Sequence, residues 1–313
     1  MKTRATALNP HNRFQPIVTD REVDPDWYND PEDDLNPDTL ATEIIQETAR
    51  SIISRNTSPD VPFDQSINPY RGCEHACIYC FARPTHAYWD MSPGLDFETR
   101  LIAKPNAAAR LREELDKPGY RFSPIALGVN TDAYQPLERD QKITRQVLEV
   151  LAEYRHPVSI ITKGALILRD LDLLAEMASE GLCSVRISLT SLSNDLKRRM
   201  EPRTAAPATR LKMIRQLSAA GIPTGIILGP VIPFINDHEI ESILEAAADA
   251  GATRASWIML RLPHELDELF QDWLHRHFPQ RAEHVMNRMR DLRGGKSYDA
   301  TFGRRMTGTG PYS

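Results

Sequence analysis

Three cysteines stand within eight residues, Cys73-Glu74-His75-Ala76-Cys77-Ile78-Tyr79-Cys80, in the spacing C-x3-C-x2-C. Thiolates hold iron–sulfur clusters, and four of them normally complete a four-iron cluster. Three thiolates leave one iron without a protein ligand, and an open metal position allows a site to bind a substrate or cofactor. The remaining cysteine, Cys183, stands in an apolar, strand-like run. The trio therefore predicts a cluster with one iron left vacant.

A structural zinc site of the Cys3His type is the alternative, with His75 or His86 as the fourth ligand. Zinc ligands usually come in two separated pairs, and the sequence has no second pair. Disulfides fit less well, because an odd trio this close together cannot pair internally. The first residues lack the apolar core of a signal peptide, and a reducing compartment keeps thiols free, so we expect a cytoplasmic protein.

The composition is that of an ordinary globular enzyme, with 41% hydrophobic and 26% charged residues. No run of residues approaches the roughly 18 apolar positions of a membrane span, so we expect no membrane association. The net charge of −5 argues against a protein built mainly to hold phosphate backbones, although it leaves room for a local basic patch.

Strands and helices alternate from about residue 66, and the strand of residues 67–70 leads into the cysteine loop. Five more strands are expected at 124–129, 158–161, 184–189, 225–228 and 255–260. Helices are expected between them at 143–154, 166–180, 208–220 and 237–250. Several strands are apolar on both faces, which is typical of a parallel sheet covered by helices. The pattern therefore predicts an α/β fold of six βα units, a barrel or partial barrel over residues 61–262.

Both flanks of this region have a different character. Residues 1–60 are expected to form an N-terminal extension that is partly irregular, because nine acidic residues and one arginine lie between Asp20 and Asp38, with prolines among them. A short amphipathic helix from Thr39 to Ser51 is expected to follow. Residues 263–313 are expected to form a C-terminal cap of two helices, 266–277 and 281–292, and a tail.

Functional side chains of α/β barrels gather at the carboxyl ends of the strands. The polar residues at these ends, or in the loops that follow, are Asn130, Thr131, Asp132, Lys163, Ser188 and Glu201. Asn, Thr and Ser also cap helices, so each of them is weak on its own. Lys163 stands out, because a lone lysine that closes an apolar strand predicts an ammonium group directed at a carboxylate.

These features together resemble the radical S-adenosylmethionine (SAM) superfamily: the cysteine spacing, Tyr79 just before the third cysteine, and the position of the loop after the first strand. The stretch from Ser66 to Trp89 and the tail around Phe302 to Met306 resemble its spore photoproduct lyase-like branch. Within that branch, residues 50–313 look most like the PA0069/Rv2578c family of uncharacterised bacterial radical SAM proteins. The resemblance implies a partial (β/α)6 TIM-like barrel of the radical SAM type.

The resemblance also implies a role for individual residues. Cys73, Cys77 and Cys80 would bind a [4Fe-4S] cluster, and the amine and carboxylate of S-adenosyl-L-methionine would chelate the vacant iron. The cofactor-binding set would be Tyr79 beside the adenine, Thr131 and Asp132 near the methionyl amine, Lys163 at the carboxylate, Ser188 near the ribose, and also Asn130, Glu201 and Gly229. Gly229 ends a G-x-I-x-G segment in which Ile232 replaces the glutamate usual in the superfamily.

The implied activity is reductive cleavage of SAM to a 5′-deoxyadenosyl radical, with electrons from an external donor of the flavodoxin or ferredoxin type. The substrate and the catalytic residues that act on it stay unassigned. No cysteine lies between Ala126 and Asp132, where spore photoproduct lyase carries its hydrogen donor, so thymine-dimer repair is not predicted.

Three other functions stay open at this point: a nucleic-acid repair or modification enzyme, an iron–sulfur electron-transfer module, and a zinc-binding protein. For nucleic acid, the candidate basic patch consists of Arg288, Arg290, Arg293, Lys296, Arg304 and Arg305. These residues could instead pair with the acidic stretch between Asp20 and Asp38.

Overall fold

The computed structural model describes residues 4–14 and 41–310 of the 313-residue chain. Its main sheet has seven strands in the order β10-β9-β8-β7-β6-β3-β2. The strands are β2 (Ile53–Arg55), β3 (Gln65–Ile67), β6 (Ile125–Leu127), β7 (Val158–Thr162), β8 (Cys183–Ser188), β9 (Thr224–Val231) and β10 (Arg254–Met259). Neighbours from β3 to β10 pair in parallel, and β2 pairs antiparallel with β3. The six predicted parallel strands are confirmed, in chain order, as an open α/β sheet.

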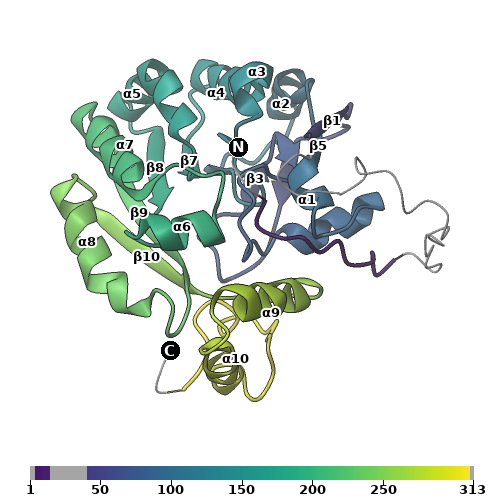
Figure 1. Cartoon of the computed structure of the whole chain (residues 1–313). Helices are drawn as coiled ribbons and strands as arrows, with labels where there is room; N and C mark the ends of the chain where they lie inside the picture. Colours follow the sequence, from purple (N-terminus) through teal and green to yellow (C-terminus); the bar gives the residue numbers. More distant parts are fainter. Residues whose placement is uncertain (1–3, 15–40, 311–313) are drawn as a thin grey trace.

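Helices surround the outer side of this sheet (Figure 1). They are α2 (Ala107–Leu115), α3 (Glu138–Gln141), α4 (Ile143–Glu153), α5 (Leu171–Ser179), α7 (Pro207–Ala219) and α8 (Ile240–Asp249), with 3-10 turns η3 (Ala165–Asp170) and η4 (Asp237–Glu239) leading into α5 and α8. The strands that these helices cover are shielded from solvent, because Ile125, Ile160 and Ile187 are fully buried. Continuous apolar strands under a helical layer give the architecture of a partial barrel.

The helix expected from Thr39 to Ser51 is wrong where the structure describes it. Residues Glu43–Gln46 form strand β1, which pairs in parallel with β5 (Arg100–Ala103) in a second, three-stranded sheet completed by β4 (Tyr70–Arg71). Ile44 lies opposite Leu101 and Ile45 opposite Ile102. Two adjacent β-branched residues favour a strand once a partner edge is available. The acidic stretch between Asp20 and Asp38 lies outside the described residues.

The two predicted C-terminal helices are confirmed as α9 (Leu266–His277) and α10 (Ala282–Asp291). They lie below the sheet in Figure 1. The indole nitrogen of Trp273 in α9 donates to the carbonyl of Arg199 at 2.9 Å, which fixes α9 against α6 (Asn194–Met200). Helix α6 follows β8, so the cap is attached at the carboxyl ends of the strands. In the described ranges no helix has the length and hydropathy needed to cross a bilayer.

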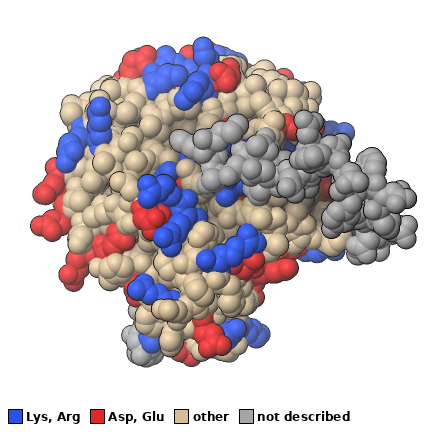
Figure 2. Space-filling model, in the orientation of Figure 1, with Lys and Arg blue, Asp and Glu red and all other residues tan. Residues whose placement is uncertain are grey.

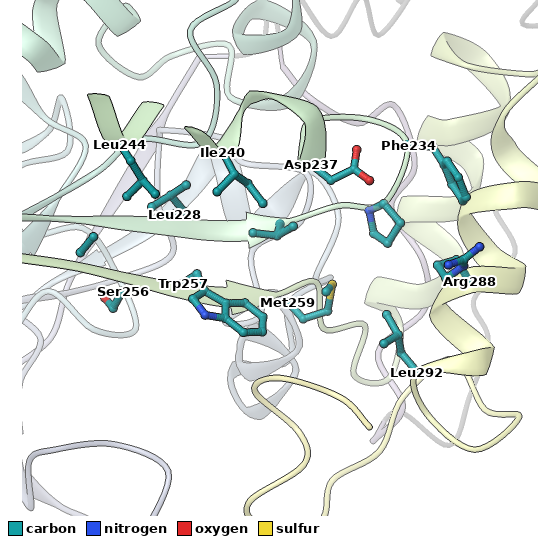
Figure 3. A pocket seen from close by; sticks show the side chains of 13 residues that line it. Leu228, Phe234, Asp237, Ile240, Leu244, Ser256, Trp257, Met259, Arg288 and Leu292 are labelled. Carbon is teal, nitrogen blue, oxygen red and sulfur yellow. The ribbon is translucent and has the colours of Figure 1, made fainter. Parts of the chain in front are cut away.

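A groove of about 480 Å³ lies alongside β9 and β10, between α8 and α10 (Figure 3). Its walls are mainly apolar, and Leu244 and Trp257 in them are 39% and 44% exposed. It exists because β10 is the last strand of the sheet, so no further βα unit covers that side. The groove is separate from the polar residues at the strand ends, which are described below.

Gly72, just before the first cysteine of the motif, needs the left-handed backbone that glycine adopts, with φ +73°. A Cβ there would stand 2.7 Å from Leu101 Cδ2 and 3.0 Å from the carbonyl of Phe97. We therefore expect Gly72→Ala to lower the free energy of unfolding by about 1–2 kcal/mol for the backbone, and by about 1–3 kcal/mol more for the overlap. Urea unfolding would measure both.

Gly119 is the matched control, because it has φ +82° and open space around its Cα. Gly119→Ala should cost only the backbone share of about 1–2 kcal/mol. Equal losses for the two variants would contradict the steric argument for Gly72.

Candidate functional site

The cysteine loop follows β3 and carries three free thiols in a dry setting. Cys73 and Cys77 are buried and Cys80 is partly buried. Burial raises the pKa of each thiol, that of Cys77 to about 12, and the neighbouring cysteines raise the pKa values of Cys73 and Cys77 further. Thiolates at these three positions would need positive charge, and an iron cluster supplies it, so the donor set fits such a group.

Both histidines considered as a fourth zinc ligand have other partners. His75 Nδ1 lies 3.2 Å from Asp132 Oδ2, and His86 Nε2 lies 2.9 Å from the carbonyl of Arg100. Burial lowers the pKa of His86 to about 4. Among residues 4–14 and 41–310, no three His, Cys, Asp or Glu side chains are grouped as around a single metal ion.

A buried arginine, Arg83, forms hydrogen bonds both to the cysteine loop and to the segment that follows it. Arg83 Nε donates to the carbonyl of Cys77 at 2.9 Å, and its Nη1 donates to the carbonyls of Pro93 and Gly94 at 3.1 and 3.0 Å. Its Nη2 pairs with Glu98, and both side chains are fully buried. Arg83 lies in the 3-10 helix η2 (Arg83–Trp89), and Glu98 lies in α1 (Asp96–Thr99). This ion pair was not predicted, because the sequence gives no sign of which carboxylate faces Arg83.

Asp132, after β6, connects the cysteine loop to the end of β7. Its carboxylate accepts from Thr162 Oγ1 at 2.6 Å and from the amide of Lys163 at 2.7 Å, and it faces His75. Burial alone would raise the pKa of Asp132, but His75, Thr162 and the Lys163 amide hold it well below its ordinary value. Asp132 is thus an ionised support for the loop, with its oxygens already engaged.

The ammonium group of Lys163 has no ion-pair partner among the described residues. Burial would lower its pKa, but the nearby charges of Cys77 and Glu201 raise it overall. Its Nζ lies 5.8 Å from the centre of the Tyr79 ring. Within the described ranges no carboxylate lies within ion-pair distance of it, which leaves three donors for a ligand oxygen.

Glu201 lies at the centre of a buried hydrogen-bond network. It accepts from the hydroxyl of Tyr79, pairs with Arg210, and accepts from Thr190 Oγ1 at 2.8 Å and Thr204 Oγ1 at 3.3 Å. Burial favours the neutral acid, but Arg210 and Lys163 lower the pKa of Glu201 to about 2. Glu201 therefore holds the tyrosine of the cysteine motif in place, and its own oxygens are occupied.

The other predicted cofactor residues differ in how they join this network. Ser188 is buried, and its carbonyl accepts from Arg210 Nη1 at 2.9 Å; the carbonyl of Gly229 accepts from Thr190 Oγ1 at 3.3 Å. Thr131 donates to the carbonyl of Tyr70 at 2.9 Å. Asn130 is exposed, and its backbone amide donates a hydrogen bond to the side-chain oxygen of Asn68. Asn130 thus stands apart from the groups around Cys77.

An open sheet of six parallel strands, with a three-cysteine loop after the first and a free lysine after the third, defines a cofactor-binding α/β partial barrel. The family model described as the radical SAM superfamily matches residues 67–247. The chain belongs to the radical SAM superfamily. Membership implies chemistry that depends on S-adenosylmethionine and an iron–sulfur cluster, and it makes the chain an enzyme.

Similar proteins are themselves uncharacterised. A Mycobacterium tuberculosis protein, Rv2578c, is 41% identical over 234 residues, which cover 74% of this chain and 68% of that protein. A Methanocaldococcus jannaschii protein is 27% identical over 246 residues, or 79% of this chain and 88% of the other. The first confirms the suspected branch of the superfamily.

Among solved structures, a spore photoproduct lyase variant has a TM-score of 0.55 at 13% identity. The match covers 76% of this chain and 66% of the lyase, so the chain spans less than two thirds of the lyase's length. At this identity the similarity establishes the fold.

Loss of the Glu201 carboxylate should destabilise the protein. Glu201→Gln leaves Arg210 buried without a counter-charge, and we expect a loss of about 3–5 kcal/mol in the free energy of unfolding at neutral pH. Because the folded pKa of about 2 lies below the ordinary value of 4.5, the wild-type contribution is complete above pH 4.5 and is lost as the pH falls toward 2. The variant should therefore show a flatter stability profile over that interval, measured by urea unfolding.

Glu245→Gln, on an exposed position of α8, is the control and should match the wild type at every pH. An unchanged acid profile in Glu201→Gln would mean that other carboxylates account for the acid sensitivity.

Proposed function

We propose that this protein binds a [4Fe-4S] cluster through Cys73, Cys77 and Cys80 and uses it to cleave S-adenosylmethionine reductively. The observation that carries the proposal is a loop that presents three free thiols, two buried and one partly buried, at the same sheet edge as the ammonium of Lys163, which has no ion-pair partner among the described residues. The match of residues 67–247 to the radical SAM superfamily supports it.

Cys73, Cys77 and Cys80 would hold the cluster, which would supply the one-electron reducing chemistry for cleavage of S-adenosylmethionine. The electron comes from an external donor, for which we propose a small flavodoxin or ferredoxin type of protein. The chain's own residues bind and shield. Lys163 would hold the cofactor's carboxylate through charge-assisted hydrogen bonds. Tyr79, fixed by Glu201, would form a wall of the cofactor pocket.

A pure electron-transfer module is disfavoured by Lys163, since a lysine without an ion-pair partner among the described residues serves no purpose in passing electrons. Two of the six residues of the predicted nucleic-acid patch, Arg293 and Arg305, are engaged within the protein. Arg293 is buried and donates to the carbonyls of Leu260 and Arg304, and Arg305 pairs with Asp60. On the face seen in Figure 2, basic and acidic side chains are interspersed, without a broad area of one sign. We therefore do not assign nucleic acid as the substrate.

Removal of any one motif cysteine should abolish the cluster. Cys73→Ala, Cys77→Ala and Cys80→Ala should each lose iron and sulfide after anaerobic reconstitution, because two thiolates no longer anchor four irons. The wild type should hold one four-iron cluster per chain and form 5′-deoxyadenosine when supplied with dithionite and S-adenosylmethionine.

Cys183→Ala is the control, since Cys183 lies buried in β8 away from the motif. Stoichiometric zinc in the wild-type protein, with no iron uptake, would overturn the proposal.

Loss of the Lys163 charge should weaken cofactor binding and spare the cluster. Lys163→Ala removes charge-assisted hydrogen bonds to a carboxylate, worth about 1.5–3 kcal/mol, so the Kd for S-adenosylmethionine should rise roughly ten- to hundredfold. Equilibrium dialysis of the reconstituted protein gives the Kd, and iron analysis reports the cluster. Lys212→Ala, on the exposed side of α7, should leave both values unchanged. A Kd that does not move in Lys163→Ala would show that the lysine has no part in cofactor binding.

A further inference from the structure

Arg261 stands two residues after β10, at the same sheet edge as the cysteine loop and Lys163. Its guanidinium carbon lies 5.4 Å from the centre of the Phe81 ring and 5.9 Å from that of Tyr298. Phe81 directly follows the cluster ligand Cys80 and is 43% exposed. A cation at the end of the last strand is therefore in contact with the residue next to the cluster.

The hydrogen bonds of Arg261 are few and weak. Its Nη2 donates to the hydroxyl of Tyr298 and its Nη1 to the sulfur of Met306, each at 3.3 Å. The Nε–H is buried and has no partner among the described residues. A guanidinium has five N–H donors, and carboxylates or phosphates satisfy them best, in a bidentate arrangement. The site lacks such an acceptor.

A second guanidinium adds to the positive charge. Arg293 is 3% exposed, its Nε is likewise buried without a partner, and both of its terminal nitrogens donate to backbone carbonyls. Burial lowers the pKa of Arg293, and the charge of Arg261 lowers it further, so the two cations are close to each other. One buried and one partly buried cation repel each other, and an anion that bound both would offset that repulsion.

The acidic groups nearby are committed elsewhere. Asp60 pairs with Arg305 and accepts from the amide of Gly303 at 2.6 Å. Asp299 accepts from the amide of Thr301 at 2.8 Å. Within the described ranges no carboxylate lies within 4 Å of Arg261 or Arg293, whose hydrogen-bond partners are neutral oxygens and a thioether.

We propose that Arg261, supported by Arg293, binds an oxyanion of the substrate, a phosphate or a carboxylate, while the exposed face of Phe81 packs against a planar group of the same molecule. Guanidinium and aromatic ring together suit a ligand that carries negative charge next to a ring. The inference rests on the proposed function for the statement that this ligand is the substrate. The anion site itself does not depend on that statement.

Phenyl phosphate is the probe, because it joins a phosphate to a ring; benzoate replaces the phosphate by a carboxylate, and benzyl alcohol removes the charge. Isothermal titration of the anaerobically reconstituted full chain should show binding of phenyl phosphate or benzoate and no binding of benzyl alcohol. The anion with the lower Kd shows whether the site prefers a phosphate or a carboxylate. Arg261→Gln should weaken that binding about ten- to hundredfold. Arg261→Lys should lie between, because it keeps the charge and loses the planar fork.

Arg254→Gln is the matched control, since Arg254 is an exposed arginine at the opposite end of the same strand. Phe81→Leu provides a second variant that leaves both guanidiniums in place, and it should weaken phenyl phosphate more than inorganic phosphate. Wild-type affinity in both Arg261→Gln and Phe81→Leu, or no binding of either anion by the wild type, would overturn the inference.

The same samples separate this inference from the proposed function. Formation of 5′-deoxyadenosine with no anion binding removes the anion site alone. Anion binding that depends on Arg261, in a protein that forms no 5′-deoxyadenosine, keeps the anion site and removes the proposed function.

Discussion

The buried carboxylate of Glu201 is the contact on which the rest of the site depends. It draws together the cysteine loop through Tyr79, the segment after β8 through Thr190, and α7 through Arg210. A carboxylate in such a place is tolerated only when each lone pair has a partner, and here four side chains supply them. Because the partners come from three different segments, the position of the cysteine loop is fixed by the barrel and not by the loop alone.

This network also explains why Lys163 is left free. Glu201 has two cations near it, but Arg210 occupies its oxygens, so the ammonium of Lys163 senses the negative charge at a distance without being neutralised by contact. Asp132 is engaged in the same way by His75, Thr162 and the backbone. Within the described part of the site, Glu201 and Asp132 are satisfied by internal partners, and the ammonium of Lys163 stays available near Cys77. Such a site attracts thiolate charge and a ligand carboxylate to the same place.

The sequence predicted what depends on local pattern. The predicted bounds of α9 match the structure to the residue, and the predicted bounds of β7 and α4 match it to within one residue. Each of these elements carries its own apolar face, which the local sequence pattern reveals. It failed where a distant partner decides. Residues Glu43–Gln46 became a strand through pairing with β5, which is more than fifty positions away. The spacing of the cysteines indicated their shared role. The hydrogen bond from Tyr79 to Glu201, in contrast, joins residues 122 positions apart and leaves no local signal in the sequence.

The two sides of the strand-end face each have two buried polar atoms without a partner among the described residues, and they differ in the carboxylates that they provide. From β3 to β8, buried carboxylates and their donors match, as they must where the geometry of a reactive cofactor has to be held. At the end of β10, Arg261 and Arg293 retain buried N–H groups without acceptors. Unsatisfied donors at a sheet edge are costly in isolation, and their cost falls when an anion arrives. We therefore place the proposed cofactor site beside the engaged carboxylates, and the proposed anion site beside Arg261 and Arg293, which have no carboxylate partner among the described residues.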